Sequence, residues 1–170
     1  MSIFQKLKNK FEAETIKEKT ETAYIYAPME GEIIPLEEIQ DGVFSAGMLG
    51  KGCGLKPSDG NVYAPFDGEI IVVAPTNHAI ALKSNEGIEL LIHVGIDTVK
   101  MNGRGFKPLV KPGDKVKCGQ SILTFSISDI EAAGYITTTA IIVSNSEEYS
   151  NVSILKKGVT TKSVEMIQIS

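Results

Sequence analysis

The segment TNHAIALKSNEGIELLIHVGIDTV, residues 76–99, holds both histidines of the chain, His78 and His93. Apolar residues are frequent in two short runs, 78–83 and 88–94, which are joined by the turn sequence SNEG. Two such runs around a polar, glycine-containing turn are typical of a β-hairpin. The segment therefore predicts two antiparallel strands, with one histidine at the start of the hairpin and the other near its end.

The register of this hairpin decides whether the two imidazoles meet. If Asn85 and Glu86 form a two-residue loop, His78 and His93 face each other with Cβ atoms about 4.5–5.5 Å apart. If the loop slides to Glu86-Gly87, the histidines are diagonal neighbours on one face. A three-residue loop would put them on opposite faces. Two of these three registers predict a histidine pair, in largely apolar surroundings.

The composition indicates a soluble, single-domain protein. The 170 residues are 42% hydrophobic, which is enough to bury a sizeable core. A net charge of −4 argues against a nucleic-acid surface and suits a basic protein partner. Cys53 and Cys118 are expected to be small buried hydrophobes in a reducing compartment. No stretch approaches the roughly 18 apolar residues of a membrane span, and no signal-peptide core is present, so we expect a cytoplasmic protein.

The N-terminal segment has a different texture. Residues 1–11 place apolar side chains at helical spacing among lysines, which predicts a short basic amphipathic helix. This helix would attach weakly to an anionic membrane surface, or it is a frayed tail or a helix packed on the domain. Residues 12–22 are rich in charge and are interpreted as a tether. The folded domain is expected to comprise residues 23–170.

The remaining sequence predicts an all-β fold, an antiparallel β-sandwich or barrel-like domain with a few short helical turns. An internal pseudo-repeat supports two related halves, since APMEGEII at 27–34 recurs as APFDGEII at 64–71. A hairpin with glycine turns is expected at 110–125. Two further strands are expected at 138–143 and 164–169, with a surface loop between them. Short helices are expected at 36–39, 128–133 and 147–149.

The motifs present favour histidine chemistry over other reaction classes. The chain contains no GxSxG nucleophile elbow and no phosphate-binding loop of the GxxxxGK[ST] or GxGxxG type. A zinc site at His78 and His93 would need a third protein ligand, and neither HxH nor HExxH occurs. Paired imidazoles instead suit phosphoryl transfer, in which one ring attacks phosphorus and the other stabilises the phosphoryl oxygens.

These residues closely resemble the glucose-type enzyme IIA of the bacterial phosphoenolpyruvate-dependent sugar phosphotransferase system. The resemblance rests on TNHA at 76–79, ELLIHVGIDTV at 89–99 and GF at 105–106. It extends to the APxxGEI turns, the VKPGDKVKCGQ unit and the IIVSN strand. The leader MSIFQKLK also resembles that of stand-alone members, so we expect a stand-alone protein rather than a fragment of a fused permease.

The resemblance implies a phosphotransferase component that forms a phosphohistidine and requires no cofactor. His93 would accept the phosphoryl group at Nε2 from the phosphocarrier HPr and pass it to the IIB domain of a sugar permease. His78 would contact the phosphoryl group, and Thr76 would orient His78. Gly95 would offer its carbonyl to Nδ1–H of His93.

The resemblance also implies a shallow apolar docking surface with an acidic rim. Asp41 and Asp97 would form the rim and speed encounter with a basic partner. The apolar positions are Val43, Phe44, Met48, Leu49, Leu91, Val94 and Val99. The alternative function is a non-catalytic regulatory or zinc-binding β module of the same fold, with zinc held by the two histidines.

Overall fold

The computed structural model describes residues 2–3, 5–6 and 21–170. The predicted amphipathic helix at 1–11 and the predicted tether at 12–22 lie largely outside the described residues. Both therefore stay predictions. Within the described residues, no helix is long and apolar enough to cross a membrane.

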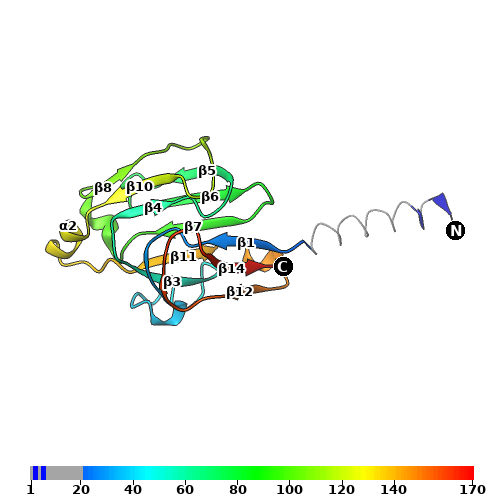
Figure 1. Ribbon diagram of the computed structural model, residues 1–170, viewed down its shortest axis with the longest axis horizontal. Coiled ribbons are helices and arrows are strands. Elements are labelled where there is room, and N and C mark those ends of the chain that lie inside the picture. The colour runs from blue at the N-terminus through cyan, green and yellow to red at the C-terminus, as the bar shows by residue number, and fades with distance from the viewer. Residues whose placement is uncertain (1, 4, 7–20) are drawn as a thin grey trace.

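The described domain is built from short strands with brief helical turns between them (Figure 1). The strands are β1 Ala23–Tyr26, β2 Gly31–Pro35, β3 Lys51–Pro57, β4 Asn61–Tyr63, β5 Gly68–Val73, β6 Ala79–Ser84, β7 Glu89–His93, β8 Phe106–Pro108, β9 Lys115–Val116, β10 Ser121–Phe125, β11 Thr139–Val143, β12 Val152–Ile154, β13 Gly158–Thr160 and β14 Glu165–Ile169. The helices are the 3₁₀ turns η1 Leu36–Glu38, η2 Thr98–Met101 and η3 Ser146–Glu148, and the α-helix α2 Ile127–Ala132. The three predicted short helices are thereby confirmed.

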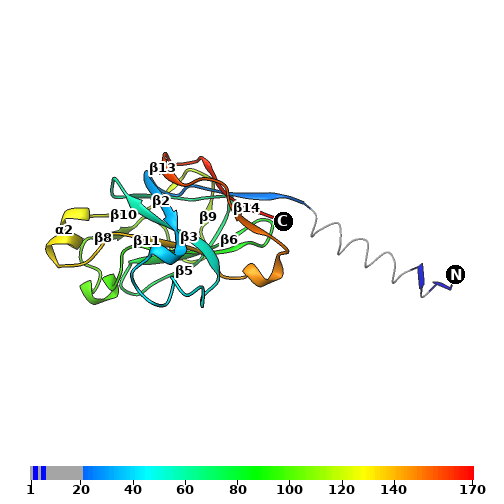
Figure 2. The same ribbon diagram turned by 90° about the horizontal axis from the view of Figure 1, so that it is seen from below.

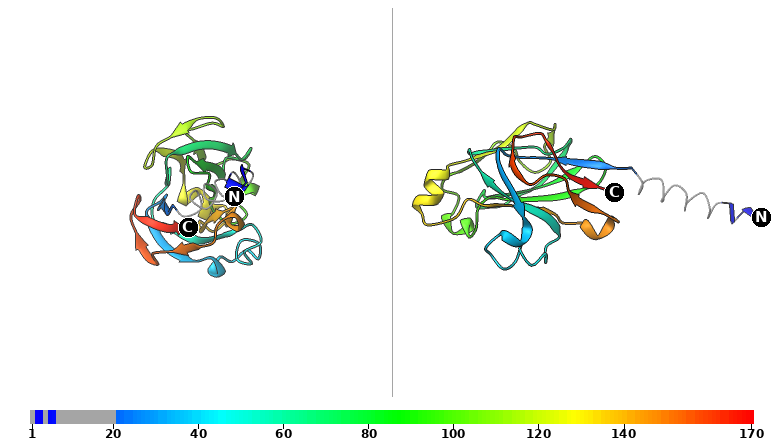
Figure 3. Two further views of the ribbon diagram at one scale, coloured as in Figure 1. Left: turned by 90° about the vertical axis from the view of Figure 1, so that its right-hand side faces the viewer. Right: turned by 60° about the horizontal axis from the view of Figure 1, so that its bottom comes forward.

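The strands form one large sheet and two small ones. The eight-stranded sheet has the order β13-β2-β3-β11-β7-β6-β5-β9, and the small sheets have the orders β1-β14-β12 and β4-β10-β8. All strand pairs are antiparallel. The sheets curve around a common interior, as the end-on view in Figure 3 shows. The prediction of an all-β, barrel-like sandwich is confirmed.

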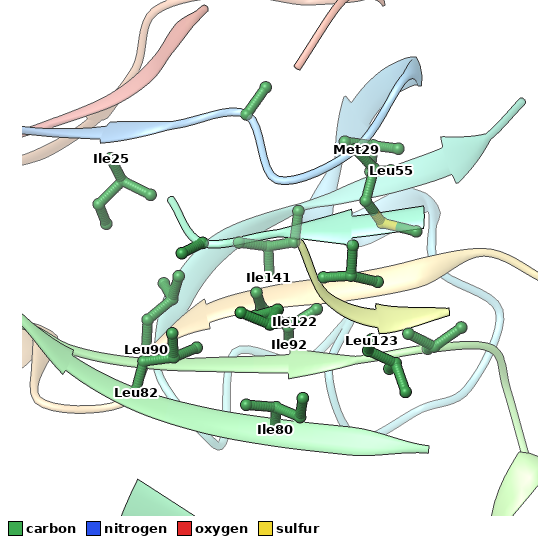
Figure 4. Packing of buried hydrophobic residues seen from close by; sticks show 14 of the residues in the cluster. Ile25, Met29, Leu55, Ile80, Leu82, Leu90, Ile92, Ile122, Leu123 and Ile141 are labelled. Atoms are coloured by element: carbon green, nitrogen blue, oxygen red, sulfur yellow. The ribbon is translucent and has the colours of Figure 1, made fainter. Parts of the chain in front are cut away.

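The core lies between the inner face of the large sheet and the two small sheets (Figure 4). Aliphatic side chains that alternate along β6, β7 and β11 point inward, and they meet side chains from β1, β3 and β10. Large aliphatic members of this cluster with at most 1% exposure include Ile25, Leu55, Ile80, Leu82, Leu90, Ile92, Ile122, Leu123 and Ile141. Burial of each such side chain stabilises the fold by about 1.5–3 kcal/mol.

A smaller cluster covers part of the opposite, outer face of the large sheet. Ile34, Leu36, Ile39, Ala140 and Ile142 are buried there beneath the segment that links β2 to β3. Phe44, Leu91 and Ile96 pack against this cluster while remaining partly exposed. The outer face is therefore apolar and covered over β2, β3 and β11, and its cover ends at β7.

The pseudo-repeat has a structural counterpart. Each copy feeds a strand of the large sheet, β2 in the first copy and β5 in the second. The glycine of each copy lies against the neighbouring strand, since a Cβ atom on Gly31 would lie 2.1 Å from the Lys56 carbonyl oxygen. A Cβ atom on Gly68 would lie 2.2 Å from the carbonyl oxygen of Lys83. Both glycines are thus required for close strand pairing.

Three sequence predictions are wrong. Residues 110–125 do not form a hairpin, because β9 pairs with β5 while β10 pairs with β4 and β8. The segment between β11 and β14 is not simply a loop, since it contains η3, β12 and β13. Cys118 is exposed rather than buried, because it lies in the polar turn between β9 and β10.

Candidate functional site

The β6–β7 hairpin has a different register from the two that predicted facing histidines. Ala79 pairs with His93 and Lys83 pairs with Glu89. The loop therefore has three residues, and the N–H of Ser84 donates to the carbonyl of Ile88 at 2.8 Å. Gly87, with a φ of 97°, supplies the left-handed residue that a three-residue loop needs. The two-residue loop is thus a wrong prediction.

The two imidazoles nevertheless lie together, with ring centroids 4.7 Å apart and ring planes at 81°. His78 precedes the first residue of β6, so the alternation of strand faces does not apply to it. Asn77, with a φ of 61°, turns the chain just before His78. The predicted proximity of the rings is confirmed, although the hairpin has the register that was expected to keep them apart.

Each histidine ring is oriented through its Nδ1 atom. The carbonyl of Gly95 accepts from Nδ1 of His93 at 2.9 Å, so Nδ1 carries the hydrogen and Nε2 carries the lone pair in the neutral ring. The hydroxyl of Thr76 lies 2.7 Å from Nδ1 of His78. Both contacts are the ones that the resemblance implies.

Gly95 can present its carbonyl to His93 because the chain is tightly folded at this point. Its φ is 78°, and a Cβ atom would lie 2.4 Å from Cγ2 of Thr98 and 2.9 Å from the carbonyl oxygen of Ile136. The buried Thr98 hydroxyl also donates to the Val94 carbonyl. Glycine is therefore needed here for both conformation and space.

Burial keeps the two rings neutral. Burial, together with the neighbouring His93, lowers the pKa of His78 to about 4, against the opposing effect of a hydrogen bond to Thr76. Burial also lowers the pKa of His93, although the Gly95 carbonyl, Asp41 and Asp97 favour the protonated ring and oppose this shift. At neutral pH the site thus holds two uncharged imidazoles, one with a free Nε2 lone pair.

Aromatic rings flank the histidine pair. The Phe44 ring lies 4.9 Å from the His93 ring, and the Phe106 ring lies 6.5 Å from the His78 ring, measured between centroids. The His93 ring therefore contacts both the His78 ring and the Phe44 ring, and its orientation depends on both neighbours.

Most of the predicted docking residues are at least partly exposed. Val43, Met48, Leu49 and Val99 are exposed, and Phe44 and Leu91 are partly exposed. Val94 is fully buried in the main core, so its assignment to the docking surface is wrong. As the residue after His93, it continues the alternation of β7 and points to the inner face.

Sequence reasoning missed one exposed apolar residue on this face. Val72 is 50% exposed and stands opposite Ala81, which stands opposite Leu91 on the next strand. A register shift between Ile70 and Val72 breaks the alternation of β5. The run of apolar residues at 70–73 gives no signal of this bulge, so only the structure reveals the outward direction.

The described residues contain no group of three or more His, Cys, Asp or Glu side chains that could hold a metal ion. The histidine pair alone supplies two nitrogen ligands. Zinc binding at this pair stays a prediction. A pocket of about 680 Å³ lies near the docking face, between the β2–β3 segment and β12, and neither histidine lines it.

Comparisons with known proteins show which family the sequence and the fold resemble. Residues 23–149 match the family described as phosphoenolpyruvate-dependent sugar phosphotransferase system, EIIA 1. The PTS system glucose-specific EIIA component of Oceanobacillus iheyensis is 44% identical over 132 residues, which cover 78% of this chain and 80% of that protein. The glucose permease IIA of Mycoplasma capricolum has a TM-score of 0.78 at 28% identity, and the match covers 88% of this chain and 96% of that one.

Several longer relatives also match. The PTS system beta-glucoside-specific EIIBCA component of Dickeya chrysanthemi is 43% identical over 145 residues, which cover 85% of this chain but 23% of that protein. The chain thus spans less than a quarter of the length of these multi-part relatives. It corresponds to most of the length of the glucose-specific EIIA components.

Proposed function

The chain belongs to the EIIA 1 family of the phosphoenolpyruvate-dependent sugar phosphotransferase system, whose members are transferases in phosphoryl transfer, and from this membership we propose that it carries the phosphoryl group on His93. The observation that carries the proposal is the hydrogen bond from Nδ1 of His93 to the Gly95 carbonyl. This bond leaves the Nε2 lone pair free for attack on phosphorus.

The first step transfers the phosphoryl group from the phosphorylated carrier HPr. Nε2 of His93 forms a bond to phosphorus while the bond between phosphorus and the donor nitrogen breaks, and the electron pair of that bond returns to the donor ring. The positive charge that develops on His93 is shared with the Gly95 carbonyl through Nδ1–H. In the second step the IIB domain of a sugar permease takes the phosphoryl group, and His93 becomes neutral again.

His78 is the partner that stabilises the phosphoryl oxygens. When the Thr76 hydroxyl donates to Nδ1 of His78, the ring hydrogen is on Nε2, which then serves as a donor to phosphate. The low pKa of His78, caused by burial and by His93, keeps it in this neutral form. A neutral donor stabilises the phosphoryl group without forming a tight ion pair that would slow onward transfer.

The apolar surface around the histidines is the docking site for both proteins. The exposed or partly exposed residues Phe44, Met48, Leu49, Leu91 and Val99 would form this surface, and the Phe44 ring lies against His93. Relatives named EIIBCA and EIICBA components support a IIB partner, because their names join the A part with B and C parts. With these partners the chain would act in the cytoplasm.

Intact mass spectrometry after incubation with phosphoenolpyruvate, enzyme I and HPr tests the proposal. We expect one acid-labile phosphate adduct on the wild type and none on His93→Gln. The His78→Gln variant should accept the group but transfer it poorly to a IIB domain. Absence of an adduct on the wild type would support the non-catalytic alternative, and labelling of His93→Gln but not His78→Gln would reverse the two roles.

A further inference from the structure

The acidic residue Asp41 makes more contacts than a rim charge requires. Its Oδ1 atom accepts from the backbone N–H groups of Val43 at 3.2 Å and Ser45 at 3.1 Å. Its Oδ2 atom accepts from the N–H of Phe44 at 2.9 Å. One carboxylate thus satisfies three successive backbone donors and closes the turn at 41–45.

Two further hydrogen bonds involve this turn: the N–H of Gly42 donates to the Ser45 hydroxyl at 3.2 Å, and the N–H of Gly47 donates to the Phe44 carbonyl at 3.0 Å. Gly42 and Gly47 adopt left-handed φ values of 79° and 70°, and a Cβ atom on either would meet nothing within 4 Å. Side-chain packing therefore does not fix the backbone at these two glycines. A carboxylate that accepts several backbone N–H groups is the stronger constraint.

The turn places the Phe44 ring beside the histidine site. Phe44 packs against the outer cluster that contains Ile34 and Ile142, and its ring lies 4.9 Å from that of His93. A change in the 41–45 backbone would move this ring. His78 is the other ring in contact with His93, so loss of the Phe44 contact would remove one of the two ring contacts that orient the imidazole.

We propose that Asp41 is a positioning residue for His93: its carboxylate folds the 41–45 turn, which holds the Phe44 ring against the imidazole and keeps Nε2 directed toward the phosphoryl donor. This inference rests on the proposed function for its kinetic consequence, but its structural part concerns the unphosphorylated protein. Asp41 acts through Phe44, and it does so in addition to any attraction of a basic partner.

The protonation state of Asp41 agrees with this role. Burial tends to raise the pKa of its carboxyl group, yet the backbone N–H groups of Phe44, Ser45 and Val43 outweigh burial and lower the pKa below its usual value. The group is therefore ionised at neutral pH, which is the form that accepts all three bonds.

Asp97 provides a matched control. Like Asp41, it is an acidic residue that favours protonation of His93 through its charge. It is exposed, and within the described part of the chain its carboxylate accepts no hydrogen bond from a backbone turn. Removal of charge alone should therefore have similar effects at both positions, whereas loss of the turn contacts is specific to Asp41.

The first measurement is the NMR spectrum of the unphosphorylated protein. We expect Asp41→Ala to shift the His93 ring protons in the direction that Phe44→Ala does, because both variants remove the ring current of Phe44. Asp41→Asn keeps one carbonyl oxygen and should give a smaller shift, and Asp97→Asn should leave these protons nearly unchanged. Equal shifts in Asp41→Ala and Asp97→Asn, or none in Asp41→Ala, would overturn the proposal.

The second measurement is the rate of phosphoryl acceptance from phosphorylated HPr at low and high salt. Salt screens attraction between exposed charges but leaves the fold of a turn intact. We expect Asp41→Ala to be slower by about tenfold at both salt concentrations, and the Asp97→Asn defect to shrink at high salt. Asparagine is used at position 97 because Asp97 has a left-handed φ of 61°, which asparagine tolerates and alanine does not. If the rate defect of Asp41→Ala disappears at high salt, Asp41 acts only by attracting the partner, and the proposal is wrong.

The two measurements separate failure of this inference from failure of the proposed function. If neither the wild type nor any variant accepts phosphate, the proposed carrier role is wrong. The NMR shifts would still show whether Asp41 positions the Phe44 ring against His93. Thermal unfolding of each variant shows whether it is folded, and Asp41→Asn serves if Asp41→Ala is not.

Discussion

The two faces of strand β7 differ sharply although the strand has five residues. Leu90 and Ile92 point inward and are each 1% exposed, whereas Leu91 and His93 point outward and are partly exposed. The inner residues join the main core, and the outer residues border a surface whose apolar cover ends beside them. Mutations of the inward residues of β7 should therefore lower stability, whereas mutations of its outward residues should mainly lower function.

The pair Leu90 and Leu91 gives the largest expected contrast. Leu90→Ala creates a cavity in the main core and should lower the free energy of unfolding by about 2–5 kcal/mol. Leu91→Ala should cost less than about 1 kcal/mol and should slow phosphoryl acceptance, since it removes apolar surface beside His93. Urea unfolding and rapid-quench kinetics would measure both. Similar stability losses in the two variants would contradict the separation of the faces.

Acid should lower the free energy of unfolding because it protonates His78. Because the pKa of His78 is about 4 in the folded protein and about 6.5 when unfolded, the unfolded chain binds more protons between these values. The stabilising effect of neutral His78 is thus complete above pH 6.5 and is lost as pH falls toward 4, by at most about 3 kcal/mol. Urea unfolding at several pH values should show a shallower pH dependence for His78→Gln than for the wild type. Identical slopes would argue against burial of a neutral His78.

The Thr76 hydroxyl tests how the two histidines differ. Thr76→Val keeps the shape of the side chain but removes the oxygen that lies 2.7 Å from Nδ1 of His78. We expect onward transfer to a IIB domain to fall by about tenfold, because the ring hydrogen of His78 is no longer fixed on Nε2. Acceptance from HPr should change little. Single-turnover assays of each step would check this, and an equal loss in both steps would mean that Thr76 serves acceptance as well.

Val72 gives the smallest expected effect and tests how far the docking face extends. Val72→Lys should leave stability within about 0.5 kcal/mol, since this side chain is half exposed. It should slow association with HPr a few-fold, because it places a charge on the apolar row that reaches Leu91. Stopped-flow association rates would measure the change. An unchanged association rate would mean that the docking face does not extend beyond β6 to Val72.

The fold class and the site chemistry were accessible from the sequence because both depend on local patterns. Apolar runs separated by turn residues predicted the strands, and the GIDTV string after His93 led to the Gly95 contact through its resemblance to a family. The roles of His93, His78 and Thr76 stay predictions until the transfer assays are made.

The details that failed depend on backbone geometry that the sequence leaves open. The SNEG turn permits loops of two or three residues, and Gly87 takes the conformation that selects three. The apolar run around Val72 does not show its bulge. Asp41 had the charge of a rim residue, but only the folded turn shows that its carboxylate binds three backbone donors. Short-range alternation is readable, whereas turn closure is decided by competition among nearly equal backbone states.

The pairing of β1 with β14 has a consequence for modular assembly. Ala23 stands opposite Ile169, so both ends of the folded domain leave it side by side, at the end remote from α2 (Figures 1 and 2). The β6–β7 turn lies at that same end, because Glu86 and Ile88 line a pocket with Tyr24 and Ile169. The histidines, at the other end of this hairpin, therefore face away from the attachment points. A linker or a neighbouring module joined at either terminus would therefore leave the histidine pair unobstructed, as the proposed carrier role would require.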